Sequence, residues 1–398
     1  MSGEDLTPSV ETDAGLISWE TWDRIKHTER FIAGTAIVFV LTFSWAITSA
    51  PVLSDIFQGY HRLALSMLAW MLLGLSFNLL LGQTGLLSFG HAMFWGGSGY
   101  AAALFAIHVH DAPLLIMVAG VSFSVVLGFL AALVLLRLHG VYFAIVTLAI
   151  AQTLYRLARE PLEPLTKGIN GLRPSFGPLL GVFELGEYHG PLEFLGSGMY
   201  VFVGIFFVAT VVLIARIRKS PYGLIFKAVQ ENETRARAIG LNVWRYRFAA
   251  FMLSAFIGGL AGTLYFMVTG PGLSSGSVVP ERMLWTNSGN LVVMVVLGGL
   301  GTIAGPLIGV FFYQWMGNFF NGLEWTIPGL EIVGPVGQYW QLLVALAFTT
   351  VVWTYPDGIW GMITDFTGAL RDPRSLPEKT MEKIPWLGSG DDTRRGDR

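Results

Sequence analysis

The ionisable side chains of this sequence are concentrated in one stretch, which separates two long apolar segments. Eight Lys and Arg residues fall between Arg216 and Arg247, and only Glu231 and Glu233 offset them there. A basic loop between membrane spans stays in the cytoplasm, because Lys and Arg are retained on that side. Within the loop we expect a short helix over residues 226–239, ended by Gly240.

The chemistry that this stretch supports is ionic contact with another protein. Arg235 and Arg237 lie in the expected helix, where they can pair with carboxylates of a partner. A short helix on a cytoplasmic loop is what a membrane subunit needs if a soluble motor is to push on it. The alternative interpretation is a loop whose charge only fixes the topology.

One further ionisable residue, His91, lies inside a predicted span. An ionisable group within a membrane is a functional hypothesis by default. His91 lies near the inner end of its span, so a hydrogen-bonded structural histidine is the competing interpretation.

Other chemistry is missing from the sequence. There is no cysteine and no Gly-x-x-x-x-Gly-Lys-Ser/Thr loop, so the chain lacks the usual phosphate cradle for ATP. Apart from His91, the predicted spans hold no ionisable residue away from their ends, whereas ion-coupled pumps carry buried charges along their path. We therefore expect the energy for any transport to come from another subunit, and we expect no enzymatic activity, cofactor or metal site.

Composition explains what must position these residues. The chain has 398 residues, of which 53% are hydrophobic and 13% charged, and the apolar residues occur in long blocks. This pattern predicts an all-α polytopic membrane protein, since a transmembrane barrel would show short alternating segments. The net charge of −2 gives no indication of nucleic-acid binding.

About 20 apolar residues are needed for each crossing. On that measure the sequence predicts ten transmembrane helices, in two related sets of five. They are residues 31–50, 62–82, 84–107, 113–137, 140–158, 197–216, 247–269, 286–300, 302–320 and 337–356.

The distribution of charge sets the expected topology. With both termini in the cytoplasm, 19 Lys and Arg residues lie inside and six outside. We therefore expect a cytoplasmic extension at 1–30, a permease domain at 31–361 with the cytoplasmic loop 216–247, and a disordered cytoplasmic tail at 362–398. The acidic residues in 1–30 argue against a cleaved signal peptide, so the first span is expected to be retained.

Glycine patterns add two expectations. Residues 81–85 (LGQTG) match 297–301 (LGGLG), each at the inner end of a span, as repeated halves of transporters would. The segment 82–106 is glycine-rich, and two interpretations stay open for it: close helix packing, or a substrate path that includes Gly90, His91, Gly96 and Gly97.

Together, five stretches resemble the permease subunits of bacterial ABC importers for branched-chain amino acids, of the LivM-like type. They cover most of residues 62–361. The stretches are LSFGHAMFWGGSGY in the segment that begins at Gly82, GVYFAIVTLAIAQTLY (Gly140–Tyr155), SPYGLIFKAVQENETRARAIGLN (Ser220–Asn242), MVVLGGLGTIAGPLIG (Met294–Gly309) and YPDGIWG (Tyr355–Gly361).

The resemblance implies an inner-membrane protein that works with a second related permease subunit, two cytoplasmic ATPase subunits and an extracytoplasmic substrate-binding protein. It implies that a segment like Ala228–Asn242 is the coupling helix that docks on the ATPase, with Glu231 and Gly240 at the family's glutamate and glycine. It also implies that Thr166–Leu172, including Thr166 and Asn170, is an outer loop near the substrate path.

Three alternatives stay open from the sequence. Related permeases carry urea or short-chain amides, although the stretches at 140–155 and 294–309 resemble the amino-acid type more. A self-contained facilitator or channel would transport without ATPase subunits. A membrane-embedded enzyme would need a cluster of His, Asp or Glu at membrane depth, and the sequence predicts none.

Overall fold

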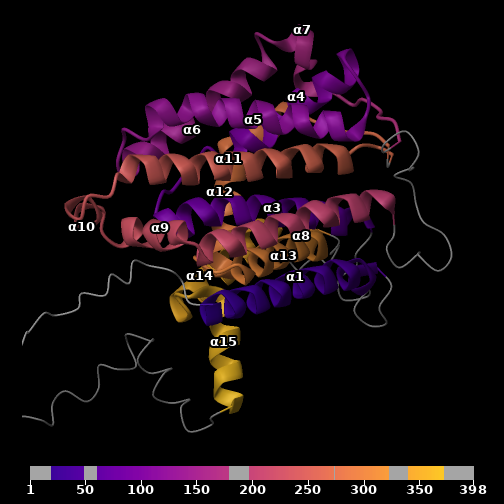
Figure 1. Ribbon diagram of the computed structural model, residues 1–398. Helices are drawn as coiled ribbons and strands as arrows, with labels where there is room; N and C mark the ends of the chain where they lie inside the picture. The colour runs from indigo at the N-terminus through magenta and orange to yellow at the C-terminus, as the bar shows by residue number, and fades with distance from the viewer. Residues whose placement is uncertain (1–18, 49–60, 179–196, 273, 322–338, 372–398) are drawn as a thin grey trace, which may run out of the picture.

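The computed structural model describes residues 19–48, 61–178, 197–272, 274–321 and 339–371, and these are almost entirely helical (Figure 1). Two isolated antiparallel bridges are the only extended pairing in these ranges. The helices are α1 (Trp19–Thr48), α3 (His61–Thr84), α4 (His91–His108), α5 (Pro113–Leu135), α6 (Val141–Arg159), α7 (Glu163–Thr166), the 3-10 turn η1 (Gly168–Asn170), α8 (Gly198–Lys219), α9 (Pro221–Glu231), α10 (Glu233–Ala238), α11 (Val243–Val268), the 3-10 turn η3 (Pro280–Met283), α12 (Trp285–Gly298), α13 (Ala304–Asn321), α14 (Trp340–Thr354) and α15 (Gly358–Arg371).

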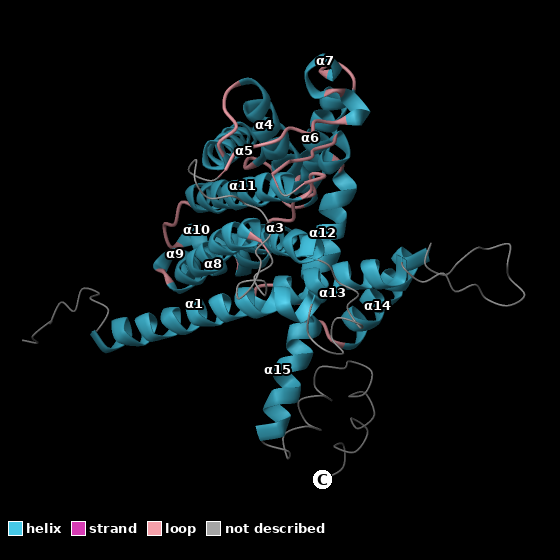
Figure 2. Ribbon diagram, turned by 90° about the vertical axis from the view of Figure 1, so that its right-hand side faces the viewer, coloured by secondary structure: helices cyan, strands magenta, loops and turns pink. Residues whose placement is uncertain are grey.

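The all-α polytopic architecture is confirmed, and each of the ten predicted spans overlaps a helix. Five helices (α3, α5, α6, α8 and α11) are long and apolar enough to cross a membrane, and α14 and α15 form a pair bent by 51°. Because α12 has only 14 residues, the count of ten crossings stays a prediction. Figure 2 shows α15 extending away from the bundle.

Two boundaries differ from the sequence prediction. The helix expected at 31–50 begins earlier, at Trp19, inside the segment that was assigned to the extension 1–30. The helix expected from residue 84 begins at His91, because Gly85 adopts a positive φ of 72° and turns the chain out of α3. The start of the extension and most of the tail after 371 lie outside the described residues.

Helix α11 forms the centre of the bundle and packs against α3, α4 and α5. Its glycines permit this close approach: a Cβ added at Gly262 would lie 2.2 Å from the carbonyl oxygen of Trp95 in α4, and one at Gly259 would lie 2.3 Å from the Cβ of Ser124 in α5. Small residues have this role between helices in lipid. Gly258 lies on the same face, where an added Cβ would be 3.3 Å from the Cβ of Phe94.

The two glycine turns that match in sequence also meet in space. The Asn78 side chain donates to the carbonyl of Thr302 (2.7 Å) and accepts from the backbone N–H of Gly301 (2.8 Å). Gly85 and Gly301, the last residues of the two motifs, have φ values of 72° and 74°. The similar φ of these two glycines supports the interpretation of 81–85 and 297–301 as a repeat, although Gly299 has a φ of 116° where its equivalent, Gln83, is helical.

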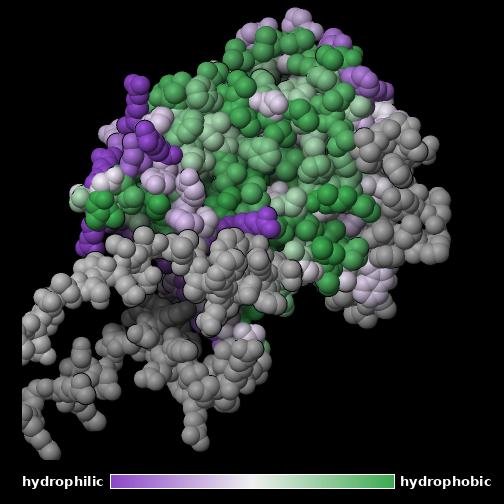
Figure 3. Space-filling model, viewed as in Figure 1, coloured by the Kyte–Doolittle hydropathy of each residue, from purple (hydrophilic) through white to green (hydrophobic). Residues whose placement is uncertain are grey.

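Most of the surface visible in Figure 3 is hydrophobic, and hydrophilic residues gather at the end that holds α9 and α10. On α5, for example, Leu115, Phe123 and Leu130 are exposed. A broad exposed apolar surface is the expected exterior of a helix bundle in lipid, where side chains need not hide from water.

Candidate functional site

The basic stretch between α8 and α11 folds into two short helices rather than one. The predicted helix 226–239 is interrupted at Asn232, whose extended backbone (φ −159°, ψ 101°) ends α9 and begins α10. The Asn232 side chain accepts a hydrogen bond from the backbone N–H of Arg235 (2.9 Å), which satisfies one of the unpaired donors at the start of α10. The expectation of a single helix is therefore wrong, because a side-chain cap replaces a helical backbone hydrogen bond at this point.

Gly240 ends α10, as the sequence predicted. Its φ is 86°, its N–H donates to Arg237, and the N–H of Leu241 reaches back to Ala236. These two bonds form a Schellman cap, which needs a left-handed residue. Leu241 then packs on the small cluster of Val229, Ala236 and Val243, so the turn also closes a hydrophobic contact.

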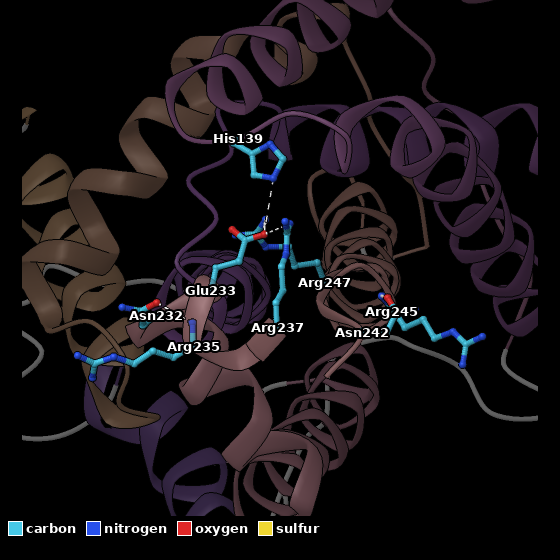
Figure 4. Close-up of polar contacts among 8 residues, drawn as sticks. All are labelled: His139, Asn232, Glu233, Arg235, Arg237, Asn242, Arg245 and Arg247. Carbon is cyan, nitrogen blue, oxygen red and sulfur yellow. Dashed lines mark hydrogen bonds and ion pairs between the residues drawn. The ribbon is translucent and has the colours of Figure 1, made fainter. Parts of the chain in front are cut away.

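Glu233, at the start of α10, is the ionic centre of this site (Figure 4). Its carboxylate pairs with Arg247 of α11 (2.7 Å), with Arg237 one turn along α10, and with the ring of His139 in the α5–α6 connection (3.6 Å). The side chain of Arg247 is only 12% exposed, so this pair is more strongly shielded from water than an ordinary surface pair. The carboxylate thereby ties α10 to the transmembrane body.

The opposite side of α9 and α10 is open. The Arg235 side chain is exposed and points away from the Glu233 cluster (Figure 4). Ile239 and Leu224 are 76% and 70% exposed, and Glu231 pairs only with Lys227 on the same helix, at 4.0 Å. Large apolar residues beside unpaired cations form a surface suited to a protein partner with carboxylates.

The site contacts the body at the matched glycine turns. Gln230 of α9 lies against Gly85, where an added Cβ would be 3.4 Å from the Gln230 side chain. A cavity of about 530 Å³ opens beside this contact, lined by the 85–89 turn, the first turns of α6 and Arg247. The basic segment 216–247, which we call the arm, is thus joined both to α11 and to the turn that follows α3.

The residues proposed for a substrate path fall into tight packing at the α4 side of the bundle. A Cβ at Gly90 would lie 2.6 Å from the carbonyl oxygen of Thr147 in α6, one at Gly96 would lie 2.3 Å from Met283, and one at Gly97 would lie 3.1 Å from Phe123. These distances support the packing interpretation of the three glycines. A lining role for them stays a prediction.

His91 is fully buried between α3, α4 and α11. Its Nε2 lies 2.9 Å from the hydroxyl of Ser254, which in turn bonds the backbone of Ser76. The imidazole packs edge-on against Phe77 and Phe94. These contacts support the structural interpretation, in which a polar side chain links three apolar helices.

Thr166 and Asn170, the two residues of the predicted outer loop, have different surroundings. The Thr166 hydroxyl donates to the carbonyls of Ala158 (2.5 Å) and Leu162 (2.8 Å), which fixes the loop to the end of α6. Asn170, by contrast, lines an outer cavity of about 540 Å³. Glu187, Glu193 and the rest of 179–196 lie outside the described residues.

Sequence reasoning missed the part played by Glu233, His139 and Arg247. The spacing of Glu233 and Arg237 at i and i+4 was a visible signal for one of the pairs. The sequence contains no signal for the pairs with His139 and Arg247, because these residues come from other elements of the fold.

Known proteins are similar to this chain over its transmembrane part. The family described as "Branched-chain amino acid transport system / permease component" matches residues 59–352. The chain is 30% identical over 262 residues to the "High-affinity branched-chain amino acid transport system permease protein LivM" of Salmonella typhimurium and to that of Escherichia coli. It is 26% identical over 230 residues to the "Probable branched-chain amino acid transport permease protein LivM" of Methanocaldococcus jannaschii.

These alignments are partial. The LivM alignments from the two bacteria cover 62% of this chain and 60% of each relative, and the archaeal one covers 55% and 61%. No solved structure matches the chain significantly. The family match covers well over half of the sequence and includes both the glycine turns and the basic arm. This chain therefore belongs to the family of branched-chain amino acid transport system permease components.

Proposed function

We propose that this chain is the permease subunit of an ABC importer that moves branched-chain or other apolar amino acids across the cytoplasmic membrane. Separate ATPase subunits drive it by pushing on α9 and α10. The family and the names of the relatives support the class of substrate. The absence of a phosphate-binding loop in the sequence supports an external source of energy.

The observation that carries the proposal is the two-sided construction of the arm. One side of α10 is bound to the body through Glu233 and Arg247, while the other presents Arg235 and Ile239 to solvent. A coupling element needs both properties, because a force applied by a partner must reach the membrane helices. A loop that only fixed topology would not need a partly buried ion pair.

The route from the arm into the membrane is short. Gln230 contacts Gly85 at the end of α3, and Asn78, less than two turns earlier on α3, holds Gly301 and Thr302. Displacement of the arm therefore acts on the inner ends of both α3 and α13. We infer that this movement opens and closes the inner mouth of the path.

The remaining partners follow from the proposed class. A second, related permease subunit would complete the membrane part, two cytoplasmic ATPases would hold α9 and α10, and an extracytoplasmic binding protein would deliver the amino acid. Both termini and the arm would lie in the cytoplasm. The substrate-binding protein would set much of the specificity.

Reconstitution in proteoliposomes tests the proposal. The assembled permease pair with its ATPases and binding protein is expected to accumulate L-leucine only with ATP, and the permeases alone are expected to accumulate nothing against a gradient. Uptake of urea in preference to leucine would favour the amide alternative. Equilibration of leucine by the permeases alone, unchanged by the ATPases, would favour a facilitator.

A further inference from the structure

A buried arginine lies at the outer side of the bundle, away from the cytoplasmic arm. Arg282 belongs to η3, the short turn between α11 and α12 that packs against α4 and α6. Its guanidinium stacks over the ring of Tyr265, with 4.1 Å between the guanidinium carbon and the ring centroid, and donates to the hydroxyl of Thr269 (3.1 Å). A planar cation placed on an aromatic face is held in a defined orientation.

The remaining donors of this cluster have no acceptor. Nε and Nη1 of Arg282 and the hydroxyl of Tyr100 are buried and have no hydrogen-bond partner in the described parts of the chain. Tyr100 is close enough to Arg282 for the two groups to interact electrostatically. An unmet buried donor is costly, and more so when it is charged, so three together need a physical explanation.

No anion within the described ranges balances the charge of Arg282. Glu281 is its neighbour in the chain, yet it interacts with Tyr100 and Arg159 and forms no ion pair with Arg282. Burial lowers the pKa of the Arg282 guanidinium below its usual value, because desolvation outweighs the attraction of Tyr265 and Tyr100. If Arg282 only anchored η3, its single bond to Thr269 would serve, and the two further buried donors, Nε and Nη1, would be unnecessary.

Aromatic side chains lie beside the guanidinium of Arg282. The rings of Trp95 and Tyr265 are 4.4 Å apart between centroids, and those of Trp70 and Trp95 are 4.8 Å apart. The cluster thus combines a fork of cationic donors with an apolar aromatic wall. An apolar amino acid has the complementary features: a carboxylate whose two oxygens accept charge-assisted hydrogen bonds, and a hydrocarbon side chain.

A short backbone ladder lies four residues before Arg282 in the chain. Leu172 and Val278 exchange both backbone hydrogen bonds, at 2.9 and 3.0 Å. Leu172 also lines the outer cavity of about 540 Å³ that includes Asn170. The ladder therefore joins a segment that borders the outer cavity to the segment that leads into η3.

We propose that Arg282, with the hydroxyl of Tyr100, forms a subsite for the carboxylate of an apolar amino acid that enters when the Leu172–Val278 ladder opens. The inference rests on the proposed function for the identity of the substrate. One carboxylate oxygen accepts from an unpaired N–H of the Arg282 guanidinium and the other from the hydroxyl of Tyr100, and the Trp95–Tyr265 surface contacts the hydrocarbon side chain. Arg282 is then a substrate-contacting residue on the outer half of the path.

Binding to the purified complex of permeases and ATPases tests the subsite. L-leucine is the probe, and L-leucinamide, which lacks the carboxylate, is the matched ligand. Thermal stability of the complex is measured with and without each ligand, because a ligand that binds the folded state raises it. We expect leucine to stabilise the unchanged complex and leucinamide to stabilise it less.

Three variants separate the recognition role from a structural one. Arg282→Gln removes the charge, Arg282→Lys keeps the charge but loses the planar fork, and Tyr100→Phe removes one hydroxyl. We expect each to abolish or weaken the leucine-induced shift and to raise KM for ATP-dependent uptake, by about ten-fold or more for the Arg282 variants, as expected for losing a charge-assisted pair of bonds. Arg137→Gln, the same change at an exposed position near the inner side, should behave as the unchanged complex.

The opposite results would overturn the subsite. Equal stabilisation by leucine and leucinamide, or an unchanged KM in both Arg282→Lys and Tyr100→Phe, would do so. If Arg282→Gln fails to assemble, Tyr100→Phe decides, because the ring and its packing remain. Failure of the proposed function would give a different result. In that case the complex without any substitution would show no ATP-dependent leucine uptake, whether or not Arg282 binds a carboxylate.

Discussion

At the scale of single residues, Glu233 is the most consequential side chain of the basic arm. It contacts residues of three elements: α10, α11 and the α5–α6 connection. Its neighbour Glu231, which the family resemblance places at the motif glutamate, contacts only Lys227. Two acids, two residues apart, therefore have different surroundings, and sequence alone does not distinguish them.

Replacing Glu233 with Gln should release α10 from the body. The change leaves Arg247 partly buried without its anion, so we expect a loss of about 1–3 kcal/mol in the free energy of unfolding and weaker ATPase binding. Thermal unfolding and copurification of the ATPases measure the two effects. Glu160→Gln, which removes an exposed carboxylate paired with Arg156 at the end of α6, is the control and should change neither; equal effects of the two substitutions would contradict the role of Glu233.

For His91 we predict a loss of stability without a loss of transport. His91→Ala removes a fully buried ring and its contact with Ser254, so we expect a loss of about 2–4 kcal/mol in stability. Leucine uptake per folded complex should remain close to normal. Normal stability with lost uptake would instead assign His91 to the path.

At the scale of elements, the break between α9 and α10 shows why the site was only partly predictable. The basic composition and Gly240 indicated the loop and the end of the helix. The position of the break depends on the competition at Asn232 between helical geometry and a side-chain cap, which differ by little energy in an isolated segment. Tertiary contacts of Val229 and Ala236 decide it.

The cap at Gly240 should be necessary for coupling. Gly240→Pro cannot adopt the positive φ or donate to Arg237, so we expect α10 to lose its end and the ATPases to dissociate, while membrane insertion is unaffected. Copurification and membrane fractionation measure these outcomes. Gly289→Ala in α12, where an added Cβ meets nothing within 4 Å, is the control.

Charge reversal on the open side of α10 tests the docking surface itself. Arg235→Glu should abolish ATPase association without loss of stability, because the exposed side chain supports no contact within the described fold. Arg237→Glu would also disturb the Glu233 cluster and so should lower stability as well. A double variant, Arg235→Glu with Gly240→Pro, that still binds its ATPases and transports normally would contradict the assignment of the arm.

At the scale of the whole molecule, the sequence predicted the helices better than their ends. Long apolar blocks located α3, α5, α8 and α11, since the bilayer demands about 20 apolar residues in each span. Hydropathy gave no signal for the early start of α1 at Trp19 or for the bend between α14 and α15. The contacts of Arg282 were also unpredictable, because they join residues of α4 and α11 to the turn η3.

The topology can be tested directly, because the natural sequence has no cysteine. A cysteine introduced at Arg235 should react with an impermeant thiol reagent only from the cytoplasmic side, and one at Asn170 only from the outside. Both positions are exposed, so labelling reports the side of the membrane rather than burial. Labelling of the Arg235→Cys variant in intact cells, where the reagent reaches only the outer face, would show that the assigned orientation is inverted.

The hydrogen bonds of Asn78 have a mechanical consequence. This side chain of α3 bonds residues that lie 223 and 224 positions away along the chain, in a turn whose Gly301 has nearly the same φ as Gly85 after the end of α3. We expect a displacement of α9 to reach α3 through Gln230 and Gly85, and then to reach the start of α13 through the side chain of Asn78. We therefore expect the turns at 81–85 and 297–301 to move together, because the hydrogen bonds of Asn78 join them.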